Sequence, residues 1–193
     1  MNTKASLREQ ISLKRKSISE KEQLESGESL VKLWKSIEGL YRAKKIALYL
    51  PVNREISTNS LISYFLQDGS KCFLPIIAQD KENKILEFAP FSVDSPLTNN
   101  RFDISEPTTS TRVDINELDI IFLPCVCFDS RGNRIGMGGG FYDKTLDQLS
   151  RNQKPQLILL AYDFQKVQCC FPENHDMKAD ACLTPNKFLK FKE

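Results

Sequence analysis

The feature that most constrains the fold is a series of short apolar runs separated by stretches of helical or polar character. The runs are Ile46–Leu50, Cys72–Ile77, Ile85–Phe91, Ile120–Phe128 and Leu157–Tyr162. Runs that are apolar throughout are typical of strands buried on both faces, and their alternation with helices is typical of a mostly parallel sheet. We therefore expect one α/β domain over residues 1–193, with a mostly parallel central sheet flanked by helices in a Rossmann-like, three-layer arrangement.

Two amphipathic segments precede the first apolar run. Residues 4–17 carry Leu7 and Ile11 on one side among basic residues, and Ser19-Glu20-Lys21-Glu22 is a capping-box pattern that begins a second helix. The apolar stripe of the second helix consists of Leu24, Leu30, Val31, Trp34, Ile37 and Leu40. We expect both N-terminal helices to pack on the sheet.

The remaining segments complete the expected order of elements. Thr58 precedes a helix whose apolar residues are Leu61, Ile62, Phe65 and Leu66. Another helix is expected over residues 141–149, and short strands are expected at Val167–Phe171 and Ala181–Leu183. Residues 94–116 are rich in Ser, Thr, Asn and Pro, which leaves two interpretations, an ordered crossing loop or a mobile flap.

Composition excludes several classes of protein. Of the 193 residues, 27% are charged and 40% are hydrophobic, which is ordinary for a folded domain and argues against disorder. No stretch approaches the ~18 consecutive apolar residues of a membrane span. The first ten residues, MNTKASLREQ, lack the apolar core of a signal peptide. We therefore expect a cytoplasmic protein with no membrane partner.

Positive charge is concentrated at the start of the chain. The net charge is +2, yet residues 1–45 alone hold 11 Lys and Arg against 6 Asp and Glu. Such a segment suits an anionic ligand such as a phosphate, but a solvated basic helix face has the same composition. Because basic and aromatic residues are not interleaved in residues 1–20, we expect no nucleic-acid partner.

Cysteine and histidine usage points to structural residues. The six cysteines are Cys72, Cys125, Cys127, Cys169, Cys170 and Cys182, and they contain no C-x-x-C pair. A Cys/His zinc site lacks ligands because His175 is the single histidine. We expect buried, reduced thiols and a structural role for His175.

Glycine is concentrated in one loop. Five of the eight glycines lie from Gly132 to Gly140, after the strand at 120–128 and before the helix at 141–149. Glycine lets a ligand approach main-chain N–H groups closely, and helix N-termini favour anions. The loop is flanked by Arg131, Arg134 and Lys144 and is typical of a phosphate site, while a tight turn is the alternative. Neither the Walker-type pattern nor the dinucleotide fingerprint is present.

The residues around this loop carry a resemblance to a known family. Three segments carry it: Leu123-Pro124, Phe128-Asp129, and the run from Gly132-Asn133-Arg134-Ile135-Gly136-Met137-Gly138-Gly139-Gly140 to Phe141-Tyr142-Asp143. Together they resemble the signature of 5-formyltetrahydrofolate cyclo-ligases, also called methenyltetrahydrofolate synthetases. Further blocks match in order: Lys4 with Leu7-Arg8, Tyr49-x-Pro51 with Glu55 and Thr58, Ala161-Tyr162 with Gln165, then Pro172, Asp176 and Asp180.

The resemblance implies an enzyme that uses ATP and Mg²⁺ to convert 5-formyltetrahydrofolate into 5,10-methenyltetrahydrofolate with release of ADP and phosphate. The implied ATP-binding residues are Lys4, Arg8, Arg134, Ile135, Gly136, Met137, Gly138, Gly139, Gly140, Phe141 and Tyr142. The implied substrate-binding residues are Pro51, Glu55 and Tyr142, and the implied Mg²⁺ ligands are Asp143 and Asp180. Such phosphoryl transfer depends on positioning and charge stabilisation, so it needs no covalent nucleophile.

These residues also have structural interpretations. Lys4 and Arg8 suit a solvated helix face, Asp143 suits the first turn of a helix, and Glu55 and Asp180 suit exposed loops. Two alternative functions follow, a catalytically silent phosphate-binding module and an RNA-associated protein. The intact set of Glu55, Arg134, Asp143 and Asp180 favours the enzyme over the silent module. We expect small molecules as its substrates and a monomer as its state.

Overall fold

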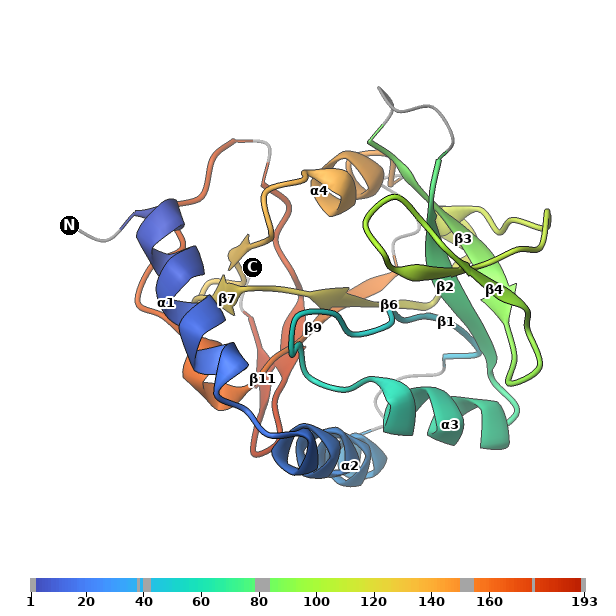
Figure 1. The fold of residues 1–193 in the computed structure, drawn as a ribbon, viewed down its shortest axis with the longest axis horizontal. Helices are drawn as coiled ribbons and strands as arrows, with labels where there is room; N and C mark the ends of the chain where they lie inside the picture. Colours follow the sequence, from blue (N-terminus) through green and yellow to red (C-terminus); the bar gives the residue numbers. More distant parts are fainter. Residues whose placement is uncertain are drawn as a thin grey trace.

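The protein was analysed as a computed structural model, which describes residues 3–37, 39, 43–78, 84–149, 155–174 and 176–191. A seven-stranded sheet runs through its centre in the order β11-β10-β9-β6-β1-β2-β3 (Figure 1). The strands are β1 (Lys45–Ala47), β2 (Lys71–Ile77), β3 (Leu86–Phe91), β6 (Ile120–Pro124), β9 (Gln156–Leu160), β10 (Ala181–Leu183) and β11 (Phe188–Lys190). The five inner strands are parallel, and β3 and β11 pair antiparallel at the edges. The predicted mostly parallel sheet is confirmed.

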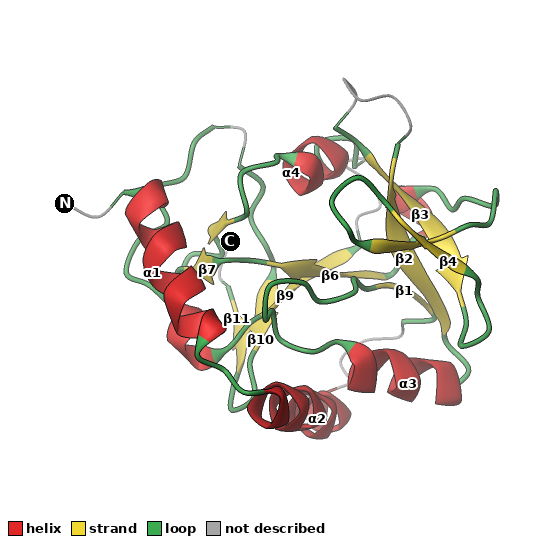
Figure 2. Cartoon of the chain, viewed as in Figure 1, coloured by secondary structure: helices red, strands yellow, loops and turns green. Residues whose placement is uncertain are grey.

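Helices cover both faces of this sheet. α2 (Glu20–Ile37) and α3 (Asn59–Gln67) lie on one face and α4 (Phe141–Leu146) lies on the other (Figure 2). Successive residues of β6 point to opposite faces, so Phe122 meets Trp34 and Phe65, while Ile121 shares the second core with Leu146. The Trp34 ring is edge-on to the rings of Phe65 and Phe122, with centroid distances of 5.5 and 5.4 Å. The predicted layers are therefore present.

The first helix packs differently from the prediction. α1 (Lys4–Lys16) buries Leu7 and Ile11 against the hairpin of β7 (Cys127–Phe128) and β8 (Arg134–Ile135), in a small core with Val126. α2 lies on the sheet as expected, but α1 lies beside the hairpin that leads into the glycine-rich loop. Its basic residues are thereby brought to that loop.

The capping box predicted for α2 is confirmed. Ser19 N–H donates to Glu22 Oε2 at 2.8 Å, and Glu22 N–H donates to Ser19 Oγ at 3.2 Å. The predicted stripe is wrong at Leu24, which is 53% exposed, because Gly27, Leu30 and Trp34 form the buried face. Leu40 lies outside the described residues.

The predicted strand over residues 120–128 is two strands. β6 ends at Pro124, which has no N–H for a further sheet bond. From Val126 the backbone turns to a new partner, because Val126 N–H donates to the Ile135 carbonyl at 2.7 Å and β7 pairs with β8. Cys125 and Cys127 therefore lie beyond the strand, both buried.

Residues 94–116 contain a small hairpin and not a plain loop. β4 (Leu97–Asn99) pairs with β5 (Ser105–Pro107), and a 3₁₀ turn, η2, covers Ile115–Glu117. Buried Glu106 anchors the hairpin, since its Oε1 accepts the Ile77 N–H at 2.8 Å and an Asn100 Nδ2 hydrogen at 2.6 Å. The sequence gives little sign of these strands because all three residues of β4 are exposed.

Smaller differences occur near the C-terminus. Residues 167–171 form no strand, although Lys166 makes a single bridge with Phe128, and a 3₁₀ turn, η3, lies at Asp163–Gln165. β10 is confirmed, whereas β11 was not predicted. All six cysteines are free, and all except half-buried Cys169 are buried. Within the described segments, none of the helices is both long and apolar enough to span a bilayer.

Candidate functional site

The two segments with the matched residues leave neighbouring strands at the same edge of the sheet. β1 and β6 are parallel, with Ile46 beside Ile120. From β1 the chain continues to β2 on one side, whereas β6 and β9 lie on the other, so the strand order reverses between β1 and β6. Ligands of open α/β sheets bind beyond the carboxyl ends of strands at such a reversal. Residues 49–58 follow β1 and the glycine-rich loop follows the β6 segment, so both belong to this region.

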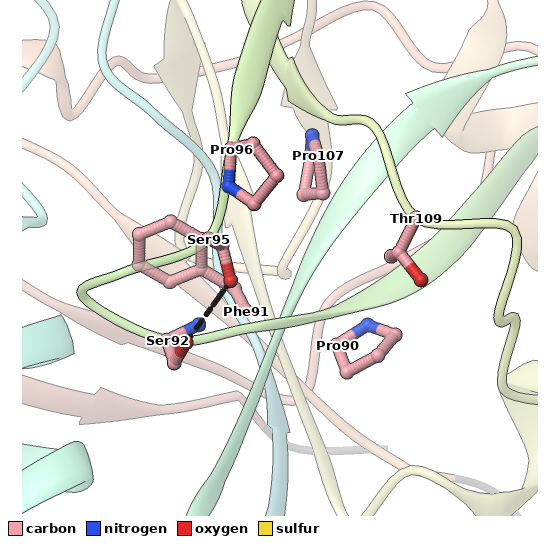
Figure 3. Close-up of a pocket in the computed structure, with 7 residues that line it drawn as sticks. All are labelled: Pro90, Phe91, Ser92, Ser95, Pro96, Pro107 and Thr109. Atoms are coloured by element: carbon pink, nitrogen blue, oxygen red, sulfur yellow. Dashed lines mark hydrogen bonds between the residues drawn. The ribbon is translucent and has the colours of Figure 1, made fainter.

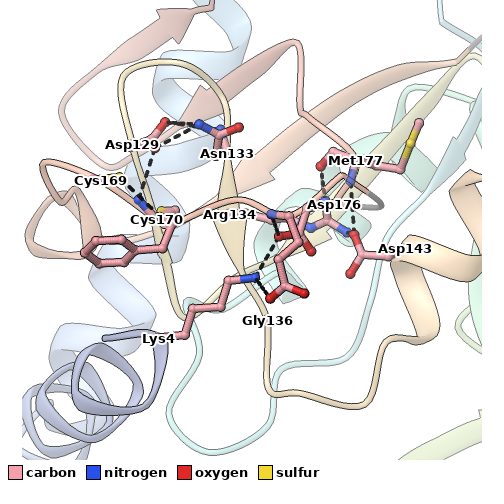
Figure 4. Close-up of polar contacts among 12 residues, drawn as sticks. Lys4, Asp129, Asn133, Arg134, Gly136, Asp143, Cys169, Cys170, Asp176 and Met177 are labelled. Atoms are coloured by element: carbon pink, nitrogen blue, oxygen red, sulfur yellow. Dashed lines mark hydrogen bonds and ion pairs between the residues drawn. The ribbon is translucent and has the colours of Figure 1, made fainter. Parts of the chain in front are cut away.

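A buried aspartate shapes the turn that leads into the loop. Asp129 is fully buried, and its carboxylate accepts the Arg131 N–H at 2.9 Å, an Asn133 Nδ2 hydrogen at 2.9 Å and the Cys170 N–H at 3.1 Å (Figure 4). Burial by itself raises the pKa of Asp129, but these hydrogen bonds outweigh it and hold the pKa below the usual range. The matched Phe128-Asp129 pair therefore has a structural role in fixing the turn.

Three glycines of the loop have backbone that other residues rarely adopt. Gly132 has φ +81°, Gly138 has φ +98° and Gly140 has φ +75°. Added side-chain atoms would meet nothing close at Gly140 and only the Arg8 guanidinium, at 3.9 Å, at Gly138, whereas at Gly132 they would meet the Ala179 carbonyl at 2.5 Å. Gly138 and Gly140 are therefore required by conformation and not by crowding. The space beside them is open, as a phosphate-binding loop requires.

α1 contributes two basic side chains to this region. Arg8 Nε donates to the Gly136 carbonyl at 2.8 Å, so the first helix is tied directly to the loop. Lys4 Nζ instead pairs with Glu173 Oε1 at 2.7 Å and Asp176 Oδ2 at 2.8 Å. Burial acts to lower the pKa of Lys4, but the two carboxylates raise it overall. Arg8 is thus placed at the loop, while Lys4 joins α1 to the C-terminal segment.

Arg134 and Asp143 form an ion pair across the loop. Arg134 Nη2 lies 2.8 Å from Asp143 Oδ1, and Arg134 Nη1 donates to the Met177 carbonyl. The Met177 N–H also donates to Asp143 Oδ1, at 3.3 Å. Both hydrogen bonds that Asp143 accepts among the described residues end on Oδ1, which leaves Oδ2 for a ligand. The Arg134 side chain is only 4% exposed, so in this structure it positions Asp143.

The matched aspartates differ in what surrounds them. Asp180 is exposed and precedes β10, and its Oδ2 accepts the Leu157 N–H at 2.7 Å at the beginning of β9. In the part of the chain that the structure describes, no three His, Cys, Asp or Glu side chains converge as metal ligands. Magnesium needs only one or two carboxylates together with phosphate oxygens and water, so Asp143 Oδ2 fits such a site. A joint site with Asp180 stays a prediction.

Glu55 is held in a strained, closely packed loop after β1. The two preceding residues, Asn53 and Arg54, have φ +49° and +57°, which is uncommon outside glycine. The Glu55 carbonyl accepts hydrogen bonds from Gln23 at 2.6 Å and Tyr162 at 3.5 Å, and the Glu55 side chain is buried. Half-buried Pro51 lies in the same loop. The structure therefore rules out the alternative of a solvated acid.

Burial shifts the pKa of Glu55. Removal from water raises its pKa above the usual 4.5. Two interactions act to lower it, namely the Val52 N–H, which donates to Oε2 at 3.1 Å, and the positive charge of Arg15, but burial has the larger effect. Arg15 Nη1 lies 3.6 Å from Glu55 Oε1, and the Arg15 side chain is 1% exposed. The pair is therefore buried and loosely joined.

Arg15 is a site residue that the sequence analysis missed. It follows Leu7 and Ile11 at spacings of four, so it lies on the buried stripe of α1, where an arginine is unusual. That position was the signal in the sequence. Its Nη2 also contacts Met137 Sδ of the glycine-rich loop at 3.6 Å. Arg15 thus lies between the two segments that leave β1 and β6.

The charge of Glu55 acts on three tyrosines. Burial raises the pKa of Tyr49, Tyr142 and Tyr162, and the Glu55 charge raises each further. Tyr142 was expected at the site, and the Glu55 charge acts on its pKa from the loop that follows β1. Phe141 faces outward to the β4–β5 hairpin, where its ring meets Phe102 edge-on at 5.9 Å.

A separate surface depression contains none of the predicted site residues. It has a volume of about 300 Å³ and is lined by Pro90, Phe91, Ser92, Ser95, Pro96, Pro107 and Thr109, between β3 and the β4–β5 hairpin (Figure 3). It lacks charged side chains, so it is not suited to phosphate. His175 lies outside the described residues, and its predicted role is not assessed.

Comparison with known proteins agrees with the residues matched above. Residues 1–185 match the model of the 5-formyltetrahydrofolate cyclo-ligase family. A 5-formyltetrahydrofolate cyclo-ligase from Haemophilus influenzae is 38% identical over 138 residues, 70% of this chain and 73% of the relative. The Escherichia coli K12 cyclo-ligase is 31% identical over 176 residues, 90% of this chain and 96% of the relative.

Solved structures show the same fold. The 5,10-methenyltetrahydrofolate synthetase of Aquifex aeolicus superposes with a TM-score of 0.83 at 27% identity, covering 98% of this chain and 93% of that one. The Mycoplasma pneumoniae 5,10-methenyltetrahydrofolate synthetase gives 0.73 at 25% identity, covering 95% and 99%. With its sequence and fold in agreement, the chain belongs to the 5-formyltetrahydrofolate cyclo-ligase family of ligase-class enzymes.

Proposed function

We propose that this enzyme converts 5-formyltetrahydrofolate into 5,10-methenyltetrahydrofolate with ATP as co-substrate and Mg²⁺ as metal. The observation that supports this most directly is the position of α1. Arg8 reaches the glycine-rich loop and Arg15 reaches Glu55, so one helix joins the proposed nucleotide site to the proposed folate site. Two substrates that must react with each other require such neighbouring sites.

The reaction proceeds by activation of a poor leaving group. The γ-phosphoryl group of ATP passes to the formyl oxygen, and ADP leaves. The neighbouring folate nitrogen then attacks the activated formyl carbon and loses its proton to water. The carbon–oxygen bond breaks, inorganic phosphate leaves, and the methenyl bridge is closed. Because both steps develop charge on phosphoryl oxygens, positioned donors lower the barrier without a covalent nucleophile.

The residues of this chain act on two sides of the site, one that holds the nucleotide and one that holds the folate. The N–H groups of the loop from Gly136 to Gly140 and the Arg8 guanidinium hold the triphosphate. Arg134 holds Asp143 in place. Mg²⁺ would be held by Asp143 through Oδ2, with Asp180 as the second predicted ligand. Mg²⁺, when bound, neutralises charge on the transferred phosphoryl group. On the other side, Glu55 accepts hydrogen bonds from the pterin ring, and Tyr142 and Pro51 line its site.

The test is a reconstituted assay. Purified protein is mixed with 5-formyltetrahydrofolate, ATP and Mg²⁺, and the absorbance of the methenyl product is followed. We expect product only when all three are present, with one ADP formed for each product molecule. Turnover without ATP would contradict the proposal, as would ATP hydrolysis that does not depend on folate. Hydrolysis alone would instead support the silent phosphate-binding module.

A further inference from the structure

The most unusual feature near Glu55 is a set of buried polar atoms without hydrogen bonds in the part of the chain that the structure describes. Arg15 Nε, Arg15 Nη1 and the Tyr49 hydroxyl are buried and make no hydrogen bond within the described residues. A buried donor without a partner costs about 1–3 kcal/mol, so proteins rarely leave several together. Their place beside the carboxyl ends of β1 and β6 is where a ligand is expected.

The geometry of the pair leaves two adjacent groups open. Glu55 Oε2 accepts the Val52 N–H, but Oε1 faces Arg15 Nη1 at 3.6 Å, beyond hydrogen-bond distance. One acceptor and one set of donors therefore lie side by side, close without bonding each other. A rigid ring edge with an N–H next to a carbonyl satisfies both, since it offers a donor to Oε1 and an acceptor to the guanidinium.

The glycine-rich loop contacts one nitrogen of the guanidinium. Met137 is 59% exposed, and its sulfur accepts from Arg15 Nη2 at 3.6 Å. Methionine is flexible and forms a weak hydrogen-bond acceptor, so a better acceptor replaces it at low cost. Movement of this exposed side chain therefore frees Nη2 for another acceptor.

From these contacts we infer that Arg15 is a second anchor for the folate ring, donating from Nε or Nη1 to the ring carbonyl while Glu55 Oε1 accepts from the adjacent ring N–H. The inference rests on the proposed function, because that function supplies a ring with this edge. It adds a residue that none of the matched blocks contains. It also assigns a selective role: Arg15 favours a carbonyl and disfavours an amino group at that ring position, since two donors oppose each other.

The experiment pairs a change in the protein with a change in the ligand. Calorimetric Kd values are measured for 5-formyltetrahydrofolate and for its analogue with the ring carbonyl replaced by an amino group. Wild type, Arg15→Met and Arg15→Lys are compared, with Lys16→Met of the exposed α1 surface as the control. We expect wild type and the control to bind the carbonyl ligand at least about 10-fold more tightly than the amino analogue, or ~1.4 kcal/mol.

Arg15→Met is expected to lose most of this discrimination and to raise KM for folate without raising KM for ATP. A remainder is expected, because the amino analogue also lacks the ring N–H that Glu55 accepts. If Arg15→Met does not fold, Arg15→Lys decides, because it keeps the charge beside Glu55 but loses Nε and the planar fork. The unfolding midpoint of each variant is measured on the same sample.

Several results would overturn the inference. They are equal affinity of wild type for the two ligands, a folded Arg15→Met variant that discriminates as strongly as wild type, and a proportional loss for both ligands with a lower unfolding midpoint. The last result assigns Arg15 to packing alone. Absence of methenyl product from wild type would instead overturn the proposed function, and the inference with it. Product formation with unchanged discrimination overturns the inference only.

Discussion

The charged side chains on the glycine-rich side of the site differ from those on the Glu55 side in burial and in how closely they are paired. Asp143, Arg134 and Lys4 all have close ionic partners, at 2.7–2.8 Å, and Asp143 and Lys4 are partly exposed. Arg15 and Glu55 are almost fully buried and are 3.6 Å apart, and two of the guanidinium nitrogens, Nε and Nη1, lack hydrogen bonds among the described residues. Partly exposed pairs are inexpensive and contribute little stability, whereas a buried and poorly bonded pair is costly.

The difference indicates which side of the site forms new hydrogen bonds when a ligand binds. On the glycine-rich side the charges hold the loop, hairpin and C-terminal segment in position before a ligand arrives. On the Glu55 side the groups are held without satisfying one another, so a ligand completes bonds that the fold leaves open. Substitutions should therefore affect nucleotide handling on the first side and folate recognition on the second.

The largest effect is expected for Glu55→Gln. The substitution keeps volume but leaves the Arg15 charge buried without its counter-ion and removes a charged acceptor from the ring. We expect kcat/KM for folate to fall about 1000-fold, ~4 kcal/mol, in steady-state assays. Glu106→Gln is the matched control, because Glu106 is also a buried carboxylate that accepts two hydrogen bonds, but it lies in the β4–β5 hairpin. An equal loss in both variants would remove Glu55 from the folate site.

Asp143→Asn tests the metal side. A hard cation with few protein ligands depends on each carboxylate, so kcat should fall about 100-fold and recover partly when Mg²⁺ is raised. Asp147→Asn, an exposed aspartate at the end of the same helix, serves as the control. If Asp143 only complements the helix dipole, turnover stays intact and stability changes by about 0.3–1 kcal/mol.

Gly138→Ala separates the loop's function from its backbone conformation. Gly138 has φ +98°, and Gly69, far from the site at the end of α3, has φ +77°. Alanine at either position should cost about 1 kcal/mol of stability, measured by denaturant unfolding. Only Gly138→Ala should weaken ATP binding, by about 10-fold in calorimetric titrations. Unchanged ATP affinity would indicate that the loop forms a tight turn and does not bind ATP.

Arg8→Ala should have a smaller effect. Its Nε bond to the Gly136 carbonyl places the guanidinium at the loop without burying it. We expect KM for ATP to rise about 5-fold while KM for folate and the unfolding midpoint change little. Lys16→Ala, on the exposed end of the same helix, should leave both constants as they are. A rise in KM for folate as large as the rise in KM for ATP would contradict the assignment of Arg8 to the nucleotide side.

The smallest effect concerns pH. Burial raises the pKa of Glu55 above its usual 4.5, so the folded state holds this proton more tightly than the unfolded state. Its contribution to stability is complete below 4.5 and is lost as pH rises through the folded pKa. Unfolding free energies of wild type relative to Glu55→Gln should therefore decline over that range, while folate binding, which uses the carboxylate, increases. A pH-independent difference would show that Glu55 titrates normally.

Much of this organisation was readable from the sequence. The apolar runs defined the parallel sheet, the capping box located the beginning of α2, and the glycines between Gly132 and Gly140 marked the loop. These features depend on local rules, namely the burial period of strands and helices, the bonding of helix ends and the conformational freedom of glycine. The matched blocks then gave the family.

The tertiary structure determined which residues the charged side chains of α1 contact. The sequence placed Arg15 in a basic helix, and only the packing of α1 on the β7–β8 hairpin put it beside Glu55, 40 positions away. The same packing put Arg8 on the loop and Lys4 on Glu173 and Asp176. Which charges are buried, paired or left open depends on contacts distant in the chain, because desolvation and hydrogen bonding are set by the whole surroundings of a group and not by its neighbours in sequence.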